Sequence, residues 1–306
     1  MSPLFTRYCF SHYCTTVTMV PSSSYASAVR FVLVVLLSRA FLALASPTPV
    51  VASGSGTIGA VDAVERDETA IDRVKRELNA RAPLAQLFSS CQNPKQVALT
   101  FDDGPYTWST EVSDLLTRAG GNGTFFYNGN NWSCIYNAEN QARVKYAVAR
   151  GHQVASHTWA HLDLTQLSFD RIHDEMWRVE QALERIVGFA PAFMRPPFGS
   201  YNDLVRQVSH QRNQSMILWD LDTGDSLGKS VSYSEQQYND TVNQNRENIL
   251  ALNHETYQNT TEQVLPYAIK LLQAKGYSLV TVAECLNMAP YQWTTTPQIP
   301  SSSWTC

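Results

Sequence analysis

Short apolar runs recur along the chain, and stretches with apolar residues at helical spacing separate them. Val97-Ala98-Leu99-Thr100-Phe101, Met216-Ile217-Leu218 and Leu250-Ala251-Leu252 have the length and composition of buried strands. Between two such runs, the stretch from Ser168 to Gly188 has helical spacing and ends at a glycine. Strands that alternate with helices along a chain predict an α/β fold built on a parallel sheet.

Five of the apolar runs are followed directly by ionisable side chains. In a barrel of parallel strands, the carboxyl ends of the strands meet on one face, and active sites lie on that face. The pattern therefore predicts one site assembled from five distant segments. The candidate residues are Asp102 and Asp103, His157 and His161, Arg195, then Asp220, Asp222 and Asp225, and finally His254.

The adjacent carboxylates of Asp102 and Asp103 are costly at the end of a buried strand. Burial and mutual repulsion would protonate one of them unless a metal ion or an arginine lies nearby. Arg195, at the start of a rigid Arg-Pro-Pro loop, is a candidate for that cation. The turn at Gly104 and Pro105 allows both carboxylates to face one cavity. The alternative for the aspartate segment is a solvated turn that caps a helix, and the alternative for Arg195 is an ordinary surface arginine.

His157 and His161 have the spacing of metal ligands. Two imidazoles four residues apart lie on one side of a helical turn and can bind one ion together with a carboxylate oxygen. Such a set leaves a coordination position for water, which favours a hydrolytic site over a closed structural one. Zinc is favoured by these ligands, and cobalt is the alternative. The competing interpretation is a pair of ordinary structural histidines.

Five segments in order resemble the motifs of the polysaccharide deacetylase family, the NodB-like carbohydrate esterases, with fungal chitin deacetylases the most similar members. The resemblance covers roughly Cys91 to Leu286. It implies a distorted (β/α) barrel with fewer than eight strands. The motifs are Thr100 to Pro105, His157 to His161, Arg195 to Gly199, Asp220 to Asp225, and Leu252 to His254.

The resemblance also implies how the metal side of the site works. Asp103, His157 and His161 would bind one divalent metal ion, and the water on that ion would be the nucleophile. Asp102 would act as general base, and Arg195 would pair with Asp102 and keep it charged. A metal lowers the pKa of its bound water, so a carboxylate of ordinary pKa suffices as the base.

On the opposite side of the substrate, the resemblance makes His254 the general acid, with Asp225 as our candidate for the carboxylate that orients it. A histidine suits this role because its pKa lies near working pH. Leu252 would line the pocket for the acetyl methyl group. The backbone N–H of Phe198 would stabilise the oxyanion.

The chain departs from the family at Ser226, where a tryptophan usually stands. The missing indole removes an aromatic wall against which a sugar or an acetyl group could pack. Tyr106, Trp108 and Trp132 lie in loops and could supply a substitute platform for substrate, although ordinary packing explains them equally well.

These roles predict a secreted hydrolase that removes N-acetyl groups from chitin or chitooligosaccharides. One alternative keeps the chemistry and changes the polymer to acetylated xylan or another cell-wall glycan. A second alternative is an inactive carbohydrate-binding protein of the cell wall, which would have no need of both a base and an acid.

Charge narrows the range of partners. The chain of 306 residues has a formal net charge of -4 and a pI near 6.0, which argues against nucleic acid or another polyanion. A neutral polymer whose product becomes cationic fits an acidic surface. We expect a monomer.

The N-terminal third predicts export. Residues 1–45 are expected to be a leader with a signal peptide, because an apolar segment precedes Ala43-Leu44-Ala45, a small-residue cleavage site; Met19 is an alternative start. Residues 46–83 are polar and poor in aromatics, as in a propeptide or linker. Residues 84–306 form the expected catalytic domain. We expect no membrane anchor in the mature chain and a location outside the cell or in the cell wall.

Cysteines and sequons agree with export. Cys91, Cys134, Cys285 and Cys306 follow the leader and permit three pairings. We favour a bond from Cys91 to Cys285, because these residues flank the predicted strands, which leaves Cys134 for Cys306. Five Asn-X-Ser/Thr sequons suggest a glycoprotein. They begin at Asn122, Asn131, Asn213, Asn239 and Asn259.

Overall fold

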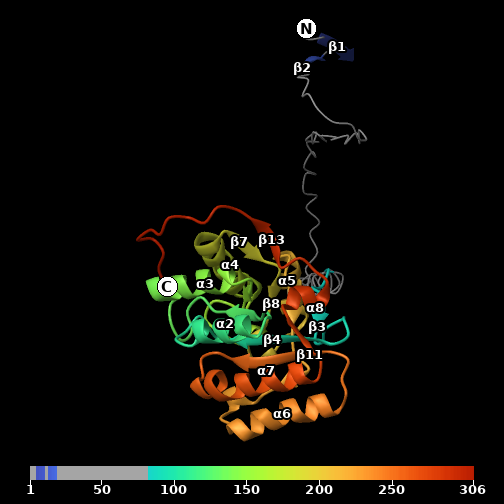
Figure 1. Cartoon of the computed structure of the whole chain (residues 1–306). Coiled ribbons are helices and arrows are strands. Elements are labelled where there is room, and N and C mark those ends of the chain that lie inside the picture. Colours follow the sequence, from blue (N-terminus) through green and yellow to red (C-terminus); the bar gives the residue numbers. More distant parts are fainter. Residues whose placement is uncertain (1–4, 11–12, 19–81) are drawn as a thin grey trace, which may run out of the picture. The chain divides into compact units, whose positions relative to one another are not determined.

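The computed structural model describes residues 5–10, 13–18 and 82–306 (Figure 1). Contacts divide the chain into residues 1–60 and 61–306. In the first unit, β1 (Phe5–Phe10) pairs antiparallel with β2 (Tyr13–Thr18). Residues 19–81 lie outside the described residues. The expected signal peptide, its cleavage site and the propeptide therefore stay predictions.

The second unit is built on one sheet of nine short strands. Eight follow one another in the order β10-β11-β4-β5-β6-β8-β9-β3, and β12 pairs with the first half of β4. All neighbouring strands run parallel. The strands are β3 (Leu87–Phe88), β4 (Gln96–Asp102), β5 (Thr124–Tyr127), β6 (Gln153–Ser156), β8 (Phe193–Met194), β9 (Ser215–Ile217), β10 (Leu221–Asp222), β11 (Ile249–His254) and β12 (Ser278–Val280).

Helices surround this sheet in the same sequence as its strands. Neighbouring helices contact one another in the order α6, α7, α2, α3, α4, α5, and Figure 1 shows α6 at the lower edge with α7 and α2 above it. Together with the curved parallel sheet, this is the expected distorted (β/α) barrel. The helices are α2 (Ser109–Arg118), α3 (Ala138–Ala149), α4 (Phe169–Val187), α5 (Asp203–Gln211), α6 (Val231–Asn243), α7 (Leu265–Ala274) and α8 (Val282–Leu286).

The sheet has more strands than the fewer than eight that we expected, because several are very short. The strands β3, β8 and β10 have two residues each, too few to show an alternating pattern in the sequence. The described residues of this unit also form four single-turn helices and an antiparallel strand pair outside the main sheet. These elements are η1 (Leu164–Gln166), η2 (Pro197–Gly199), η3 (Asp225–Leu227), η4 (Thr260–Val264), β7 (Phe189–Pro191) and β13 (Tyr291–Thr294).

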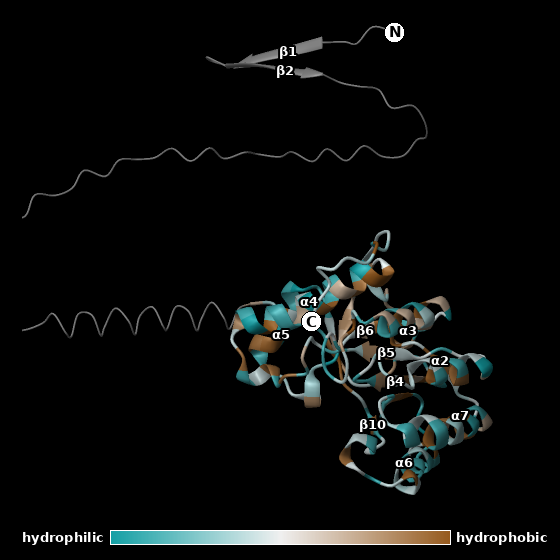
Figure 2. Ribbon diagram, turned by 90° about the vertical axis from the view of Figure 1, so that its left-hand side faces the viewer, coloured by the Kyte–Doolittle hydropathy of each residue, from teal (hydrophilic) through white to brown (hydrophobic). Residues whose placement is uncertain are grey.

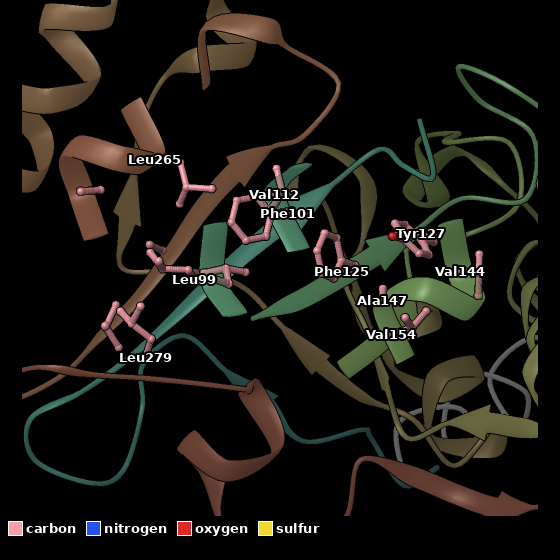
Figure 3. Packing of buried hydrophobic residues seen from close by; sticks show 14 of the residues in the cluster. Leu99, Phe101, Val112, Phe125, Tyr127, Val144, Ala147, Val154, Leu265 and Leu279 are labelled. Carbon is pink, nitrogen blue, oxygen red and sulfur yellow. The ribbon is translucent and has the colours of Figure 1, made fainter. Parts of the chain in front are cut away.

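Alternation along β4 explains why a buried strand can deliver catalytic groups. Leu99 and Phe101 belong to the core between sheet and helices, where Figure 3 shows Leu99, Phe101, Phe125 and Leu265 packed together. Ala98 belongs to a second apolar cluster inside the barrel. Because successive strand side chains point to opposite faces, Asp102 shares the inner face with Ala98.

The helix α4 shows how the sequence positions this scaffold. It begins after Ser168 and ends at Gly188, as predicted. Gly188 has φ 77°, a left-handed conformation that glycine adopts without steric cost. In Figure 2 the helices carry both teal and brown segments, the mark of elements with one solvent face and one packed face.

Two disulfides join distant parts of the unit, both as favoured from the sequence. Cys91 bonds to Cys285, and Cys134 bonds to Cys306. The second bond attaches the C-terminal end to the loop after β5. Within the described part of the chain, no helix is long and apolar enough to cross a membrane.

Candidate active site

Asp102 and Asp103 meet in one cavity at the carboxyl end of β4. Asp102 is the last residue of the strand and is 2 % exposed. Asp103 has φ 77°, so the backbone turns there and brings the second carboxylate to the same side. The cavity has a volume of about 400 Å³. Its lining residues are Asp102, Asp103, His157, His161, Pro196, Phe198, Gly199, Trp219, Asp222, Ser226, Leu227, Leu252, His254 and Tyr257.

Arg195 lies beneath the cavity and is fully buried. Its Nη1 donates to Asp102 Oδ1 at 2.8 Å and to Thr100 Oγ1 at 2.6 Å. Its Nε and Nη2 donate to the carbonyl oxygens of Ile217 and Leu218. This matches the predicted pairing of Arg195 with Asp102 and excludes a surface arginine.

Burial opposes the charge of Asp102 even with this partner. Desolvation raises the pKa of Asp102 above its usual value, although the charge and the hydrogen bond of Arg195 act in the opposite direction. One arginine therefore does not fully offset the cost of burying this carboxylate. A second cation next to Asp102 would favour its ionised form.

His157 and His161 lie in a loop after β6, and the expected helical turn between them is wrong. Thr158 and His161 have φ 69° and φ 54°, which no α-helix contains. The rings nevertheless lie together, with centroids 4.9 Å apart. The loop backbone therefore achieves what we had ascribed to helical spacing.

Asp103, His157 and His161 are arranged as a metal site. Their ligand atoms all lie within 4.8 Å of one another. Asp103 Oδ1 is 3.3 Å from His161 Nε2 and 3.7 Å from His157 Nε2. Burial and the neighbouring His161 lower the pKa of His157 to about 3, so His157 is neutral. Its Nδ1 lies 2.8 Å from the carbonyl oxygen of Arg195, which places the proton on Nδ1 and leaves Nε2 free for an ion. The donor set fits a divalent cation.

His254 and Asp225 form the second ionisable pair. His254 Nδ1 is 2.8 Å from Asp225 Oδ1, and the backbone N–H of His254 donates to Asp225 Oδ2. Thr260 Oγ1 also donates to Oδ2. Burial alone would lower the pKa of His254, but the hydrogen bond and charge of Asp225, aided by Asp102 and Asp103, raise it to about 9. His254 is therefore a protonated imidazolium at neutral pH.

The predicted substrate residues divide into two groups. Leu252 and Phe198 line the cavity; the Phe198 side chain is 67 % exposed and its ring centroid lies 4.7 Å from that of His161. Tyr106 and Trp132 do not line it. Their tilted rings have centroids 5.3 Å apart, and the Trp132 ring contacts the cavity residue Tyr257 at 5.8 Å.

Trp219 and Tyr257 are cavity residues that the sequence analysis missed. Trp219 lies under Gly199, where any Cβ would come within 2.8 Å of the indole. The cavity therefore has an indole wall despite Ser226, which corrects our expectation of a missing aromatic surface. The position of Trp219 directly before the fourth motif was the available signal.

Glu255 is a further residue that we had not singled out. It follows His254 directly, is fully buried, and accepts a hydrogen bond from Ser109 Oγ at 3.0 Å. Burial and the charges of Asp102 and Asp103 raise the pKa of Glu255 well above its usual range. Gly104 has to be a glycine here, because a Cβ would lie 1.8 Å from Glu255 Oε1.

Comparison with known proteins identifies the family of this chain. Residues 89–217 match the polysaccharide deacetylase family. A chitin deacetylase of Colletotrichum lindemuthianum is 36 % identical over 230 residues, which cover 72 % of this chain and 89 % of that protein. A chitin deacetylase of Pestalotiopsis sp is 34 % identical over 224 residues, or 71 % of this chain and 72 % of that protein.

A solved structure gives the same assignment. The structure of the chitin deacetylase from Colletotrichum lindemuthianum superposes with a TM-score of 0.66 at 34 % identity and covers 70 % of this chain and 96 % of that one. The chain belongs to the polysaccharide deacetylase family, and it is a hydrolase of that class.

Proposed function

We propose that this protein is a secreted, metal-dependent deacetylase that hydrolyses the N-acetyl groups of chitin or chitooligosaccharides. The observation that carries the proposal is one cavity lined both by a possible cation site and by a buried histidine with a raised pKa. The similarity to two fungal chitin deacetylases supports the choice of polymer.

Asp103, His157 and His161 would hold the ion, for which zinc is the favoured metal and cobalt the alternative. When bound, a divalent ion lowers the pKa of water, polarises the amide carbonyl and favours the ionised form of Asp102. Asp102 then removes a proton from the water that attacks the carbonyl carbon. Arg195 orients the Asp102 carboxylate through its Oδ1.

The acid side completes the hydrolysis. Attack of water forms a new C–O bond, and His254 donates its Nε2 proton to the sugar nitrogen as the C–N bond breaks. The products are acetate and a free amine on the sugar. Asp225 holds His254 by Nδ1, so Nε2 is the nitrogen that carries the transferable proton. The backbone N–H of Phe198 is our candidate donor to the oxygen of the attacked carbonyl.

The walls of the cavity suggest how an acetylated sugar would sit. Leu252 offers an apolar surface to the acetyl methyl group, and Trp219 and Tyr257 offer aromatic surfaces for a pyranose ring. Trp132, which contacts Tyr257, and Tyr106, which contacts Trp132, would extend this surface toward a neighbouring sugar. The disulfides agree with a protein that folds outside the cytosol.

The test is acetate release by the secreted protein from chitin oligomers and from acetylated xylan, each with and without chelator. We expect chelator-sensitive release from chitin oligomers. Release only from xylan would show that the enzyme hydrolyses acetyl esters and not N-acetyl groups, and release from neither substrate would favour a carbohydrate-binding protein.

Two substitutions distinguish the role of the general base from that of a metal ligand. Asp102→Asn should retain zinc but lose nearly all turnover, whereas His157→Ala should lose both. Zinc content measured on the purified variants, alongside acetate release, distinguishes the two results, and normal activity in either variant would contradict the proposed roles.

A further inference from the structure

The loop after β5 joins the two segments that carry the proposed metal ligands. Asn128, which is 1 % exposed, donates through its amide to the carbonyl oxygens of His157 and Thr158. These contacts hold the loop in which Thr158 has φ 69°, a conformation that a β-branched residue adopts only when its surroundings impose it. Asn128 therefore fixes the backbone of the histidine segment.

Asn131 extends this link to the aspartate segment. Its Nδ2 donates to Asn128 Oδ1 at 3.2 Å and to Asp103 Oδ1 at 3.3 Å. That same carboxylate oxygen lies 3.3 Å from His161 Nε2. A carboxylate oxygen has two lone pairs, so one can accept from Asn131 while the other faces an ion. The two asparagines thus connect Asp103 to the segment of His157.

The amide of Asn131 has a second potential use that conflicts with the first. Asn131-Trp132-Ser133 is an N-glycosylation sequon, and Asn131 is exposed. A glycan would be attached to Nδ2. A primary amide has two N–H donors, and the Asn131 amide already has two acceptors within hydrogen-bond distance, Asn128 Oδ1 and Asp103 Oδ1. Attachment of a sugar would remove one donor and place the sugar next to Asp103.

We propose that Asn131 is a positioning residue that holds Asp103 in place for the metal, and that the active enzyme carries no glycan at this sequon. The proposal rests on the proposed function, because it takes Asp103 as a metal ligand. Groups that hydrogen-bond to a metal ligand orient it, and their loss weakens metal binding by about 10- to 100-fold.

The experiment compares Asn131→Ala with Ser133→Ala in enzyme secreted from a glycosylating host. Both substitutions abolish the sequon, but only the first removes the hydrogen bond to Asp103. Peptide mass spectrometry measures glycan occupancy, competition with a chromophoric chelator measures zinc affinity, and acetate release measures kcat and KM. Thermal unfolding of the metal-free proteins shows whether both variants fold.

We expect an unoccupied Asn131 in the wild type and wild-type zinc affinity and kcat in Ser133→Ala. Asn131→Ala should bind zinc about ten-fold more weakly and show a lower kcat with an unchanged unfolding temperature of the metal-free protein. Wild-type zinc affinity in a folded Asn131→Ala, or a glycan on Asn131 in fully active enzyme, would overturn the inference. Unaltered zinc binding by His157→Ala would instead show that the metal site itself is assigned wrongly.

Discussion

Replacement of Asp225 by asparagine tests the acid side of the site most directly. Asp225 accepts hydrogen bonds from both nitrogens of His254 that face it, the backbone N–H and Nδ1. The pKa of His254 is raised from 6.5 to about 9, which corresponds to about 3 kcal/mol in favour of the imidazolium. Asp102 and Asp103 supply part of this effect, so an uncharged residue at 225 should remove most of it but not all.

The expected result is a change in pH dependence. His254 must be protonated to donate its proton, so activity should decline on the alkaline side as His254 loses its charge. In Asp225→Asn that decline should begin about one to two pH units lower than in the wild type. The assay is kcat/KM for acetate release from chitin oligomers between pH 5 and pH 10. Asp203→Asn removes one negative charge from the first turn of α5, outside the cavity, and serves as the control.

The free energy of unfolding should also depend on pH through Asp225 and His254. The pKa of Asp225 is lowered, because its hydrogen bonds and the charge of His254 outweigh burial. Asp225 therefore contributes fully to the free energy of unfolding above pH 3.8, and this contribution is lost as the pH falls below that value. The pKa of His254 is raised, so its contribution is complete below pH 6.5 and is lost as the pH rises through about 9. Urea unfolding should therefore show a larger loss for Asp225→Asn at pH 6 than at pH 9.5. In the activity profile, the result that would refute His254 as the acid is an Asp225→Asn variant with a lower rate whose activity declines at the same alkaline pH as that of the wild type.

Three further predictions concern residues around the cavity. Burial raises the pKa of Glu255 and so favours its neutral form. Glu255→Gln should therefore keep near wild-type stability in urea unfolding, whereas Glu255→Ala should lose about 1–3 kcal/mol; equal losses in both variants would indicate a charged carboxylate. Trp219→Ala should raise KM for chitin oligomers roughly ten-fold through loss of its aromatic surface, and an unchanged KM would exclude a contact with substrate. Joint replacement of Cys134 and Cys306 by serine should lower the free energy of unfolding by about 2–4 kcal/mol, measured by denaturant titration, and unaltered stability would mean that the bond constrains neither state.

Much of the reaction chemistry could be predicted from the sequence because it depends on local pattern. Apolar runs such as Val97 to Phe101 become strands of a parallel sheet, and their carboxyl ends meet at one face whatever the details of packing. The ionisable residues that follow those runs, Asp103, His157 and His254 among them, therefore had to come together. Their order along the chain, read as a set, also indicated the family.

The means by which some of these residues meet could not be predicted in the same way. The histidine pair needed no helical turn, because two left-handed residues, Thr158 and His161, shape the loop instead. At Thr158 the backbone is held by Asn128, which lies about thirty residues earlier in the chain and donates to the carbonyl oxygens of His157 and Thr158. Hydrophobic periodicity carries no information on such contacts.

The sequence alone indicated the class of fold, the ionisable residues that line the cavity and the favoured disulfide pairs. The tertiary structure decided which neighbours surround them: Trp219 as a cavity wall, Glu255 as a buried carboxyl group against Gly104, and Asn131 as a donor to Asp103. The physical reason is that strand and helix patterns arise from nearest neighbours, whereas burial, pKa and hydrogen-bond partners depend on side chains brought together from distant segments.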